Sequence, residues 1–293
     1  MYPPRKLFLF PLVLLALACS ETPQEQPSSA APQPEATAHS AAAPTELVLR
    51  SDLQWEALNP ARGDQSPRAA NLWGDRQGTE ATGFLVQFVD GFSSPPHLHN
   101  VSYRALVLGG EIHNDDPAAA QLWMPPGSFW TQPAGEVHIT SARGTDNVAY
   151  VEIDRGPYLV QPVEEAFVNG EYPINVHADN LVWLDATSSD FLASSTTISR
   201  PEKAPLWASD RLRGLLLRLP VGFAGDLTSE GDEFRAVLIK GRLAYGQAAT
   251  PEAPALLPGS YFGSRGTARH SLRVEGEAEV QLYLRTNGRV DLK

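Results

Sequence analysis

Cysteine and charge are both scarce in this sequence. Cys19 is the single cysteine among 293 residues, which excludes a disulfide within the chain and a cluster of thiolate metal ligands. Charged residues make up only 19% of the chain, fewer than a coiled coil or a solvated helical array needs. The chain has 23 basic and 34 acidic residues, and its net charge is therefore −11. This negative charge disfavours binding to nucleic acids or to an anionic membrane surface.

Segments with the pattern of a long amphipathic helix are also missing. The 25 prolines and 23 glycines divide the chain into short apolar runs joined by turns. Residues 147–154 and 277–284 come close to strict alternation of apolar and polar side chains, which is typical of strands. With 42% apolar residues and a length that fits about two domains, the sequence predicts an all-β protein built as sandwiches, jelly rolls or barrels.

The N-terminal apolar run is too short to span a bilayer. Leu7–Ala18 follows Arg5 and Lys6 and has the length of the apolar part of a signal peptide. The run ends directly before Cys19 and resembles the lipobox of bacterial lipoproteins. This resemblance implies cleavage before Cys19, attachment of lipid to it and, from Ser20, a location at the outer membrane facing the periplasm. The alternative is an ordinary secretory signal, over residues 1–18, with an incidental cysteine.

The next segment lacks the residues that build a core. Residues 20–46 contain five prolines and no aromatic residue, Leu, Ile or Val. Such a composition does not offset the entropy of ordering the chain. We therefore expect a lipidated cysteine and disordered linker over residues 19–48, with the lipid as the only contact with a membrane.

The rest of the chain contains an internal repeat. Residues 91–112 and 222–243 align at a constant offset, and Leu72-Trp73 matches Leu206-Trp207. The repeat predicts a tandem duplication with copies at residues 49–174 and 175–293.

Two groups of residues in the first copy have spacings of special interest. Gly91, His97, His99, Tyr103 and Gly110 follow the pattern G-x5-H-x-H-x3-Y-x6-G. Because side chains two residues apart on a strand point to one face, His97 and His99 are expected to lie together.

The second group is Gly127, Pro133, Gly135 and His138, in the pattern G-x5-P-x-G-x2-H. Taken in this order, the two patterns resemble the two motifs of the cupin superfamily, with Tyr103 at the position of the usual Glu. The sequence around them is similar to that of a family of bacterial two-cupin proteins whose function is unassigned. The resemblance implies two tandem cupin barrels (double-stranded β-helices, or jelly rolls), and cupins often form homodimers.

The candidate metal ligands are His97, His99 and His138. Three neutral imidazoles that converge in a barrel can hold one divalent transition metal, for which Fe, Zn, Mn and Ni are the candidates, and leave coordination positions open. Tyr103 is either a ligand or a hydrogen-bond donor behind the ligands, and a packing role is equally open because its counterpart is Phe234. Glu136 is a weak candidate for a general base, with Tyr103 as the other weak catalytic candidate.

The second copy has lost this pattern. Thr228 and Glu230 stand at the positions of His97 and His99, and His270 at that of His138. One histidine and one carboxylate rarely hold a transition metal, so the second barrel is expected to be a degenerate cupin without metal.

The sequence is compatible with three functions. The first is a metal-dependent enzyme of oxygenase or lyase type that acts on a small polar molecule. The second is a non-catalytic protein that binds or senses a metal or small ligand, and the third is a purely structural pair of barrels. A fold alone does not separate them.

Overall fold

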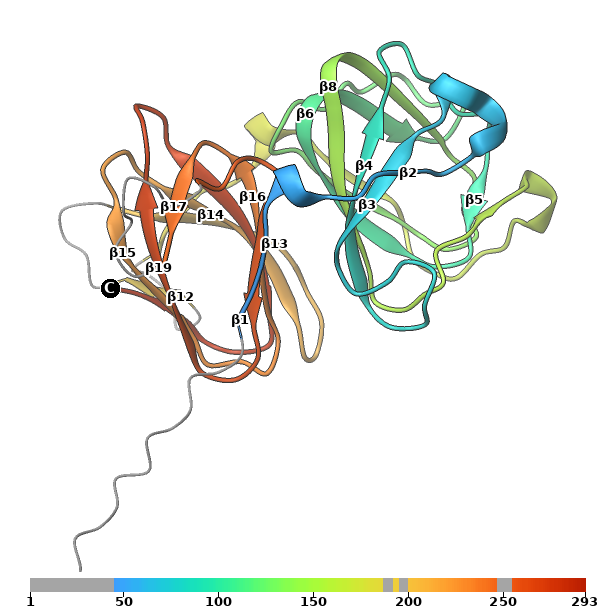
Figure 1. The fold of residues 1–293 in the computed structure, drawn as a ribbon. Coiled ribbons are helices and arrows are strands. Elements are labelled where there is room, and N and C mark those ends of the chain that lie inside the picture. The colour runs from blue at the N-terminus through green and yellow to red at the C-terminus, as the bar shows by residue number, and fades with distance from the viewer. Residues whose placement is uncertain (1–44, 187–191, 195–199, 247–254) are drawn as a thin grey trace, which may run out of the picture. The chain divides into compact units, whose positions relative to one another are not determined.

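The structure, a computed structural model, describes residues 45–186, 192–194, 200–246 and 255–293 (Figure 1). Strands dominate, and the helical segments of this part of the chain are short 3-10 turns, which confirms the predicted all-β fold. These turns are η1 (Arg50–Asp52), η2 (Pro60–Gln65), η3 (Val163–Glu165) and η4 (Ala178–Asn180). No helix of the described residues is long and apolar enough to cross a membrane. The expected signal peptide, Cys19 and nearly all of the expected linker lie outside the described residues.

The first barrel is built around a seven-stranded sheet. Its strand order is β10 (Ile174–Val176), β7 (Phe129–Gln132), β6 (Tyr103–Asp115), β8 (Ile139–Ile153), β4 (Thr82–Phe88), β3 (Arg68–Trp73) and β2 (Glu56–Ala57). A separate pair, β5 (Leu98–His99) and β9 (Val160–Gln161), lies beside this sheet. The site residues predicted from the sequence lie on or next to β5, β6 and β8.

A bend lets β6 and β8 close the barrel. The two strands pair from Tyr103–Ile153 to Asp115–Ile139, and their register shifts on either side of Gly109. Gly110 has a φ of +65°, and a Cβ there would overlap the side chain of Asn147. The bend therefore requires glycine, which explains the Gly-Gly pair inside an otherwise apolar strand.

The second barrel repeats this architecture. Its seven-stranded sheet has the order β1 (Thr45–Val48), β18 (Tyr261–Ser264), β16 (Phe234–Lys240), β20 (Val280–Thr286), β14 (Arg213–Leu219), β13 (Glu202–Ala208) and β11 (Leu184–Asp185). A five-stranded sheet faces it, in the order β12 (Leu192–Ser194), β21 (Val290–Leu292), β15 (Ala224–Ser229), β19 (Ala268–Val274) and β17 (Leu243–Tyr245). The two barrels confirm the tandem cupin fold expected from the motifs.

The barrels exchange their edge strands. β1, from before the first copy, pairs with β18 of the second barrel, and β10, from the junction of the copies, pairs with β7 of the first. Residues 45–48 therefore form a strand where the sequence analysis expected linker. The Glu46 carboxylate fixes this strand, because it accepts hydrogen bonds from Arg235 (2.8 Å) and Tyr261 (2.8 Å). The backbone groups of β1 cover the otherwise open edge of β18.

Apolar side chains form three clusters, one inside each barrel and one shared between the two seven-stranded sheets. Along β4, Phe84 and Val86 point into the first barrel, whereas Leu85 points into the shared cluster. Leu216 of β14 joins the shared cluster, whereas its neighbours Leu215 and Leu217 lie inside the second barrel. Because both faces of these sheets are buried, β14 and β16 contain continuous apolar runs, Leu215–Leu217 and Ala236–Ile239, rather than alternating ones.

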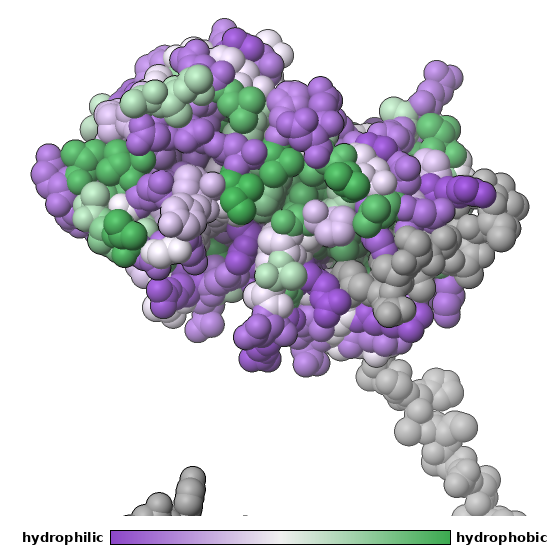
Figure 2. Space-filling model, turned by 180° about the vertical axis from the view of Figure 1, so that it is seen from behind, coloured by the Kyte–Doolittle hydropathy of each residue, from purple (hydrophilic) through white to green (hydrophobic). Residues whose placement is uncertain are grey.

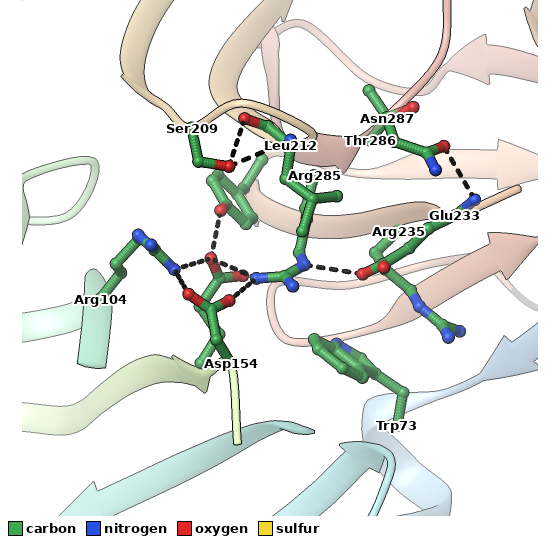
Figure 3. A network of polar contacts seen from close by, with 12 residues as sticks. Trp73, Arg104, Asp154, Ser209, Leu212, Glu233, Arg235, Arg285, Thr286 and Asn287 are labelled. Carbon is green, nitrogen blue, oxygen red and sulfur yellow. Dashed lines mark hydrogen bonds and ion pairs between the residues drawn. The ribbon is translucent and has the colours of Figure 1, made fainter. Parts of the chain in front are cut away.

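A buried polar network lies within the contact between the barrels (Figure 3). Glu152 of β8 and Arg285 of β20 stand at equivalent positions of the two copies, and their Oε1 and Nη1 atoms are 3.4 Å apart. Neither side chain is exposed by more than 2%. The carboxylate also accepts hydrogen bonds from Tyr150 (3.0 Å) and Tyr283 (2.8 Å), so each oxygen of the buried carboxylate has a hydrogen-bond donor.

The face of the molecule shown in Figure 2 is mostly polar and carries separate apolar patches. Several exposed apolar side chains come from the segment between β8 and β10, namely Leu159, Val160, Val163, Phe167, Val168 and Tyr172. Through β9, this segment also packs against the strand that carries His99.

Candidate metal centre

The chain brings His97, His99 and His138 together from two distant segments. His97 and His138 form an isolated antiparallel bridge in which each backbone N–H donates to the other residue's carbonyl, at 3.0 and 2.9 Å. His99 lies two residues after His97 and points to the same side, with its ring centroid 5.1 Å from that of His97 and 5.2 Å from that of His138. One ligand nitrogen from each imidazole lies within 4.8 Å of the others. Over residues 45–186, 192–194, 200–246 and 255–293, these three form the one such group of His, Cys, Asp or Glu.

Backbone carbonyls fix the tautomer of each imidazole. The Nδ1 atoms of His97, His99 and His138 lie 3.0, 3.0 and 3.2 Å from the carbonyl oxygens of Pro95, Leu159 and Glu136. A carbonyl oxygen only accepts, so each Nδ1 carries the proton and each Nε2 keeps a lone pair. Such hydrogen bonds behind the ligating atoms are the usual way in which proteins orient metal-binding histidines.

The triad is neutral at physiological pH. Burial, together with a smaller effect of the neighbouring His97, lowers the pKa of His138 to about 3. Burial, with repulsion from His138 and His97, holds the pKa of His99 well below its usual range, and burial also lowers the pKa of His97. Neutral imidazole is the form that binds metal.

His138 has a buried ring nitrogen whose hydrogen-bonding capacity no described protein group satisfies. Its side chain is 1% exposed, and its Nε2 atom has no hydrogen-bond partner among the described residues. A buried polar atom without a partner costs roughly 1–3 kcal/mol. The donor set, three neutral nitrogens with one orphaned lone pair, therefore fits a borderline-soft divalent cation.

Tyr103 occupies the position of the cupin glutamate, as the spacing predicts. Its hydroxyl donates to Asn114 Oδ1 at 3.1 Å and accepts from Trp130 Nε1 at 3.5 Å. Burial raises the pKa of Tyr103, so the phenol keeps its proton. Its ring lies against His99, with centroids 5.3 Å apart. The structure thus shows a packed hydrogen-bond donor beside the triad, and a role for Tyr103 as ligand stays a prediction.

Tyr158 is a site residue that the sequence analysis missed. Its ring stacks on that of His99, with centroids 4.3 Å apart, and its hydroxyl lies 3.1 Å from His99 Nε2. Because that nitrogen carries the lone pair, the phenol donates the hydrogen bond. Burial holds the pKa of Tyr158 well above its usual range. No spacing rule links Tyr158 to the cupin motifs, so only the folded loop after β8 reveals it.

Glu136 lies apart from the cavity of the triad. Its backbone carbonyl orients His138, but its side chain lines a separate cavity together with Phe167 and Tyr172. Burial, followed by the nearby Asp115, raises the pKa of the Glu136 carboxyl. The structure does not bring this carboxylate into the cavity that His97 and His99 line.

The cavity in front of the triad has a volume of about 380 Å³. Besides His97, His99, Tyr103 and Tyr158, its walls are largely apolar. The apolar lining includes Leu58, Pro67, Val86, Phe88, Phe92, Ala149, Val151 and Val160. A mostly apolar cavity with a few convergent polar groups is the usual form of a small-molecule site.

In the second barrel, side chains pack around His270, the counterpart of His138. His270 Nδ1 lies 2.9 Å from the Tyr245 hydroxyl and Nε2 lies 3.1 Å from the Ser264 hydroxyl, so both nitrogens have partners. The rings of Phe234 and Phe262 pack on the imidazole at 5.0 and 5.1 Å. Thr228 and Glu230 do not join His270 in a group of converging ligand atoms among the described residues.

The buried His270 predicts a pH-dependent stability. Burial lowers the pKa of His270 to about 4, from an ordinary value near 6.5. Between these values the unfolded chain binds a proton that the folded chain does not, so stability falls as pH falls from about 6.5 to about 4. His270→Gln is expected to remove a slope of about 1.4 kcal/mol per pH unit in this window.

Urea unfolding of both proteins at several pH values from 4.5 to 7 measures this slope. The matched control is His177→Gln, because the His177 side chain is 26% exposed and lies at the start of η4. If wild type and His270→Gln lose stability in parallel over this range, the prediction is wrong.

Comparison with solved structures identifies the class of the fold. The chain resembles a putative dioxygenase from Nostoc punctiforme with a TM-score of 0.60 at 14% identity, over 84% of this chain and 82% of that one. It resembles an oxalate decarboxylase from Lactobacillus farciminis, crystallised as a formate complex, with a TM-score of 0.55 at 10% identity, over 83% and 86% of the two chains. For the oxalate decarboxylase from Bacillus subtilis, studied for its Mn(II) centres, the TM-score is 0.52 at 11% identity, over 85% and 78%.

These similarities show that the chain shares the two-barrel fold of these solved structures. Residues 46–293 match the family described as a domain of unknown function, DUF4437, and the chain belongs to this family. No curated protein sequence matches it.

Proposed function

We propose that the first barrel binds one divalent transition metal ion through His97, His99 and His138, and that the chain acts as a metal-dependent cupin. The observation that carries this proposal is the convergence of three ligand nitrogens within 4.8 Å, each with its other ring nitrogen bound to a backbone carbonyl. The orphaned Nε2 of the buried His138 supports it independently. Three imidazoles suit Fe, Zn or Ni and accommodate Mn.

The residues around the triad define what the site would do with a bound molecule. The bound ion would supply a Lewis acid with open coordination positions. Because the Nε2 lone pair of His99 would be bound to the ion, the Tyr158 hydroxyl would be released to donate its proton to a bound molecule, and the apolar walls would exclude water. We therefore propose an enzyme of the oxygenase or lyase type, the reaction classes named for the similar dioxygenase and oxalate decarboxylase structures.

Titration with cobalt tests the metal site directly. Chain stripped with a chelator is titrated with Co²⁺, and the visible absorption of the bound ion gives the stoichiometry. We expect saturation at one ion per chain and a rise in stability of about 2.7 kcal/mol when free Co²⁺ reaches 100 times its dissociation constant. Absence of both effects would overturn the proposal and favour a purely structural pair of barrels.

We also propose that the chain is exported and attached to the outer membrane through a lipid on Cys19. The apolar run before Cys19 and the proline-rich segment after it support this proposal. Expressed in a Gram-negative host with an alkyne-labelled fatty acid, the chain is expected to carry the label and to sediment with membranes. Cys19→Ala is expected to lose both properties and Ser29→Ala, within the linker, to keep them. Label that persists in Cys19→Ala would contradict the anchor.

A further inference from the structure

Arg62 lines the cavity that also contains His97 and His99. It belongs to η2, and its guanidinium carbon lies 4.9 Å from the centre of the Phe92 ring. Among the described residues, the guanidinium makes one hydrogen bond, to the Ser93 carbonyl, and it is long at 3.4 Å. Within the described ranges no carboxylate lies at ion-pair distance from Arg62, in contrast to Arg50 and Arg76, which both pair with acids.

Besides Arg62, His97 and His99, the cavity is lined mainly by apolar side chains, with Asn59, Ser94 and Thr140 as further polar residues. Phe88 and Phe92, in contact at a centroid distance of 5.1 Å, line it together with Val86 and Val160. Its volume of about 380 Å³ is near the lower end of the range for ligand cavities, roughly 300–1,000 Å³. A molecule that fills it must be small and largely apolar, with polar groups that can bind Arg62 and the imidazoles.

We infer that this cavity takes a small organic acid whose carboxylate binds Arg62 and whose apolar body lies against Phe88 and Phe92. An arginine without a protein carboxylate presents a planar pair of N–H donors that matches a ligand carboxylate. The three neutral imidazoles add no negative charge that would repel the acid. This inference deepens the proposed function, because the other end of the acid would face the metal site, and it changes the expected substrate from simply polar to amphipathic.

Binding of 3-phenylpropionate and of its neutral amide, measured by calorimetry on metal-free and cobalt-loaded chain, tests the inference. Wild type is expected to bind the acid more tightly than the amide. Arg62→Gln is expected to weaken acid binding about 10- to 100-fold, as loss of a charge-assisted hydrogen bond does, and to leave amide binding nearly unchanged. Arg62→Lys is expected to restore part of the affinity.

The matched control is Arg68→Gln. Arg68 also donates to a backbone carbonyl, that of Trp55, but does not line the cavity. It is expected to bind the acid like wild type. An acid that binds Arg62→Gln as tightly as wild type, an amide that binds as tightly as the acid, or no binding of the acid to wild type would each overturn the inference.

The same experiment separates this inference from the proposed metal site. Arg62→Gln is expected to keep one Co²⁺ per chain, because Arg62 is no ligand. Cobalt binding without Arg62-dependent acid binding overturns the inference and leaves the metal site intact. Arg62-dependent acid binding in a chain that takes no cobalt supports the acid site and overturns the metal site.

Discussion

Alanine at any one of His97, His99 and His138 is expected to lower the affinity for Co²⁺ by more than about 100-fold. Each imidazole supplies one of three nitrogens that lie within 4.8 Å of one another. Loss of a residue that merely orients a ligand already costs about 10- to 100-fold in affinity, so loss of the ligand itself costs more. Titration of the three variants with Co²⁺, followed by visible absorption, measures the effect.

The control for these variants is His177→Ala. His177 lies at the start of η4, away from the triad, and is expected to bind Co²⁺ like wild type. Far-ultraviolet circular dichroism and urea unfolding of the metal-free proteins show whether each variant folds. A folded His138→Ala protein that binds Co²⁺ with wild-type affinity would remove His138 from the site.

Arg285→Met is expected to destabilise the chain by about 3–5 kcal/mol, because it leaves a buried carboxylate without its main partner. Arg285 is 2% exposed and contacts Glu152, Asp154 and Glu233 at 3.4, 2.8 and 2.7 Å (Figure 3). Without it, the one cation that the fully buried Glu152 keeps among the described residues is Arg104, at 3.7 Å. Urea unfolding at pH 7 measures the loss.

Two further variants show whether the effect comes from the buried charge. Arg289→Met removes a 52% exposed partner of Asp291 and is expected to cost less than about 1 kcal/mol. Adding Glu152→Gln to Arg285→Met is expected to restore part of the stability, since it removes the unpaired charge. Equal losses for Arg285→Met and Arg289→Met would contradict the account of the interface.

Local patterns were enough to predict the all-β fold and to place His97 beside His99. Turn residues and short apolar runs indicate strands, and the two-residue spacing of His97 and His99 places both imidazoles on one face. The spacing alone does not place His138 opposite them. That step came from the resemblance to the cupin motifs, and the backbone bridge between His97 and His138 is its structural basis.

The features that could not be predicted from the sequence depend on contacts between residues far apart in the chain. The exchange of β1 and β10 depends on which sheet edge each short strand meets, and a four-residue or three-residue strand carries too little pattern to specify it. Tyr158 and Arg62 reach the cavity from a loop and a turn, where side-chain periodicity gives no information. Glu152 and Arg285 stand at equivalent positions of the repeat, but only the packing of the two sheets shows that they pair.

The central claim is that one metal ion lies between His97, His99 and His138. Diffraction from crystals grown with Zn²⁺, recorded on both sides of the zinc absorption edge, locates the ion directly. We predict one anomalous peak about 2.0–2.1 Å from the Nε2 atoms of all three residues. A peak bound to other residues, or crystals in which the three imidazoles turn away from a common point, would contradict it.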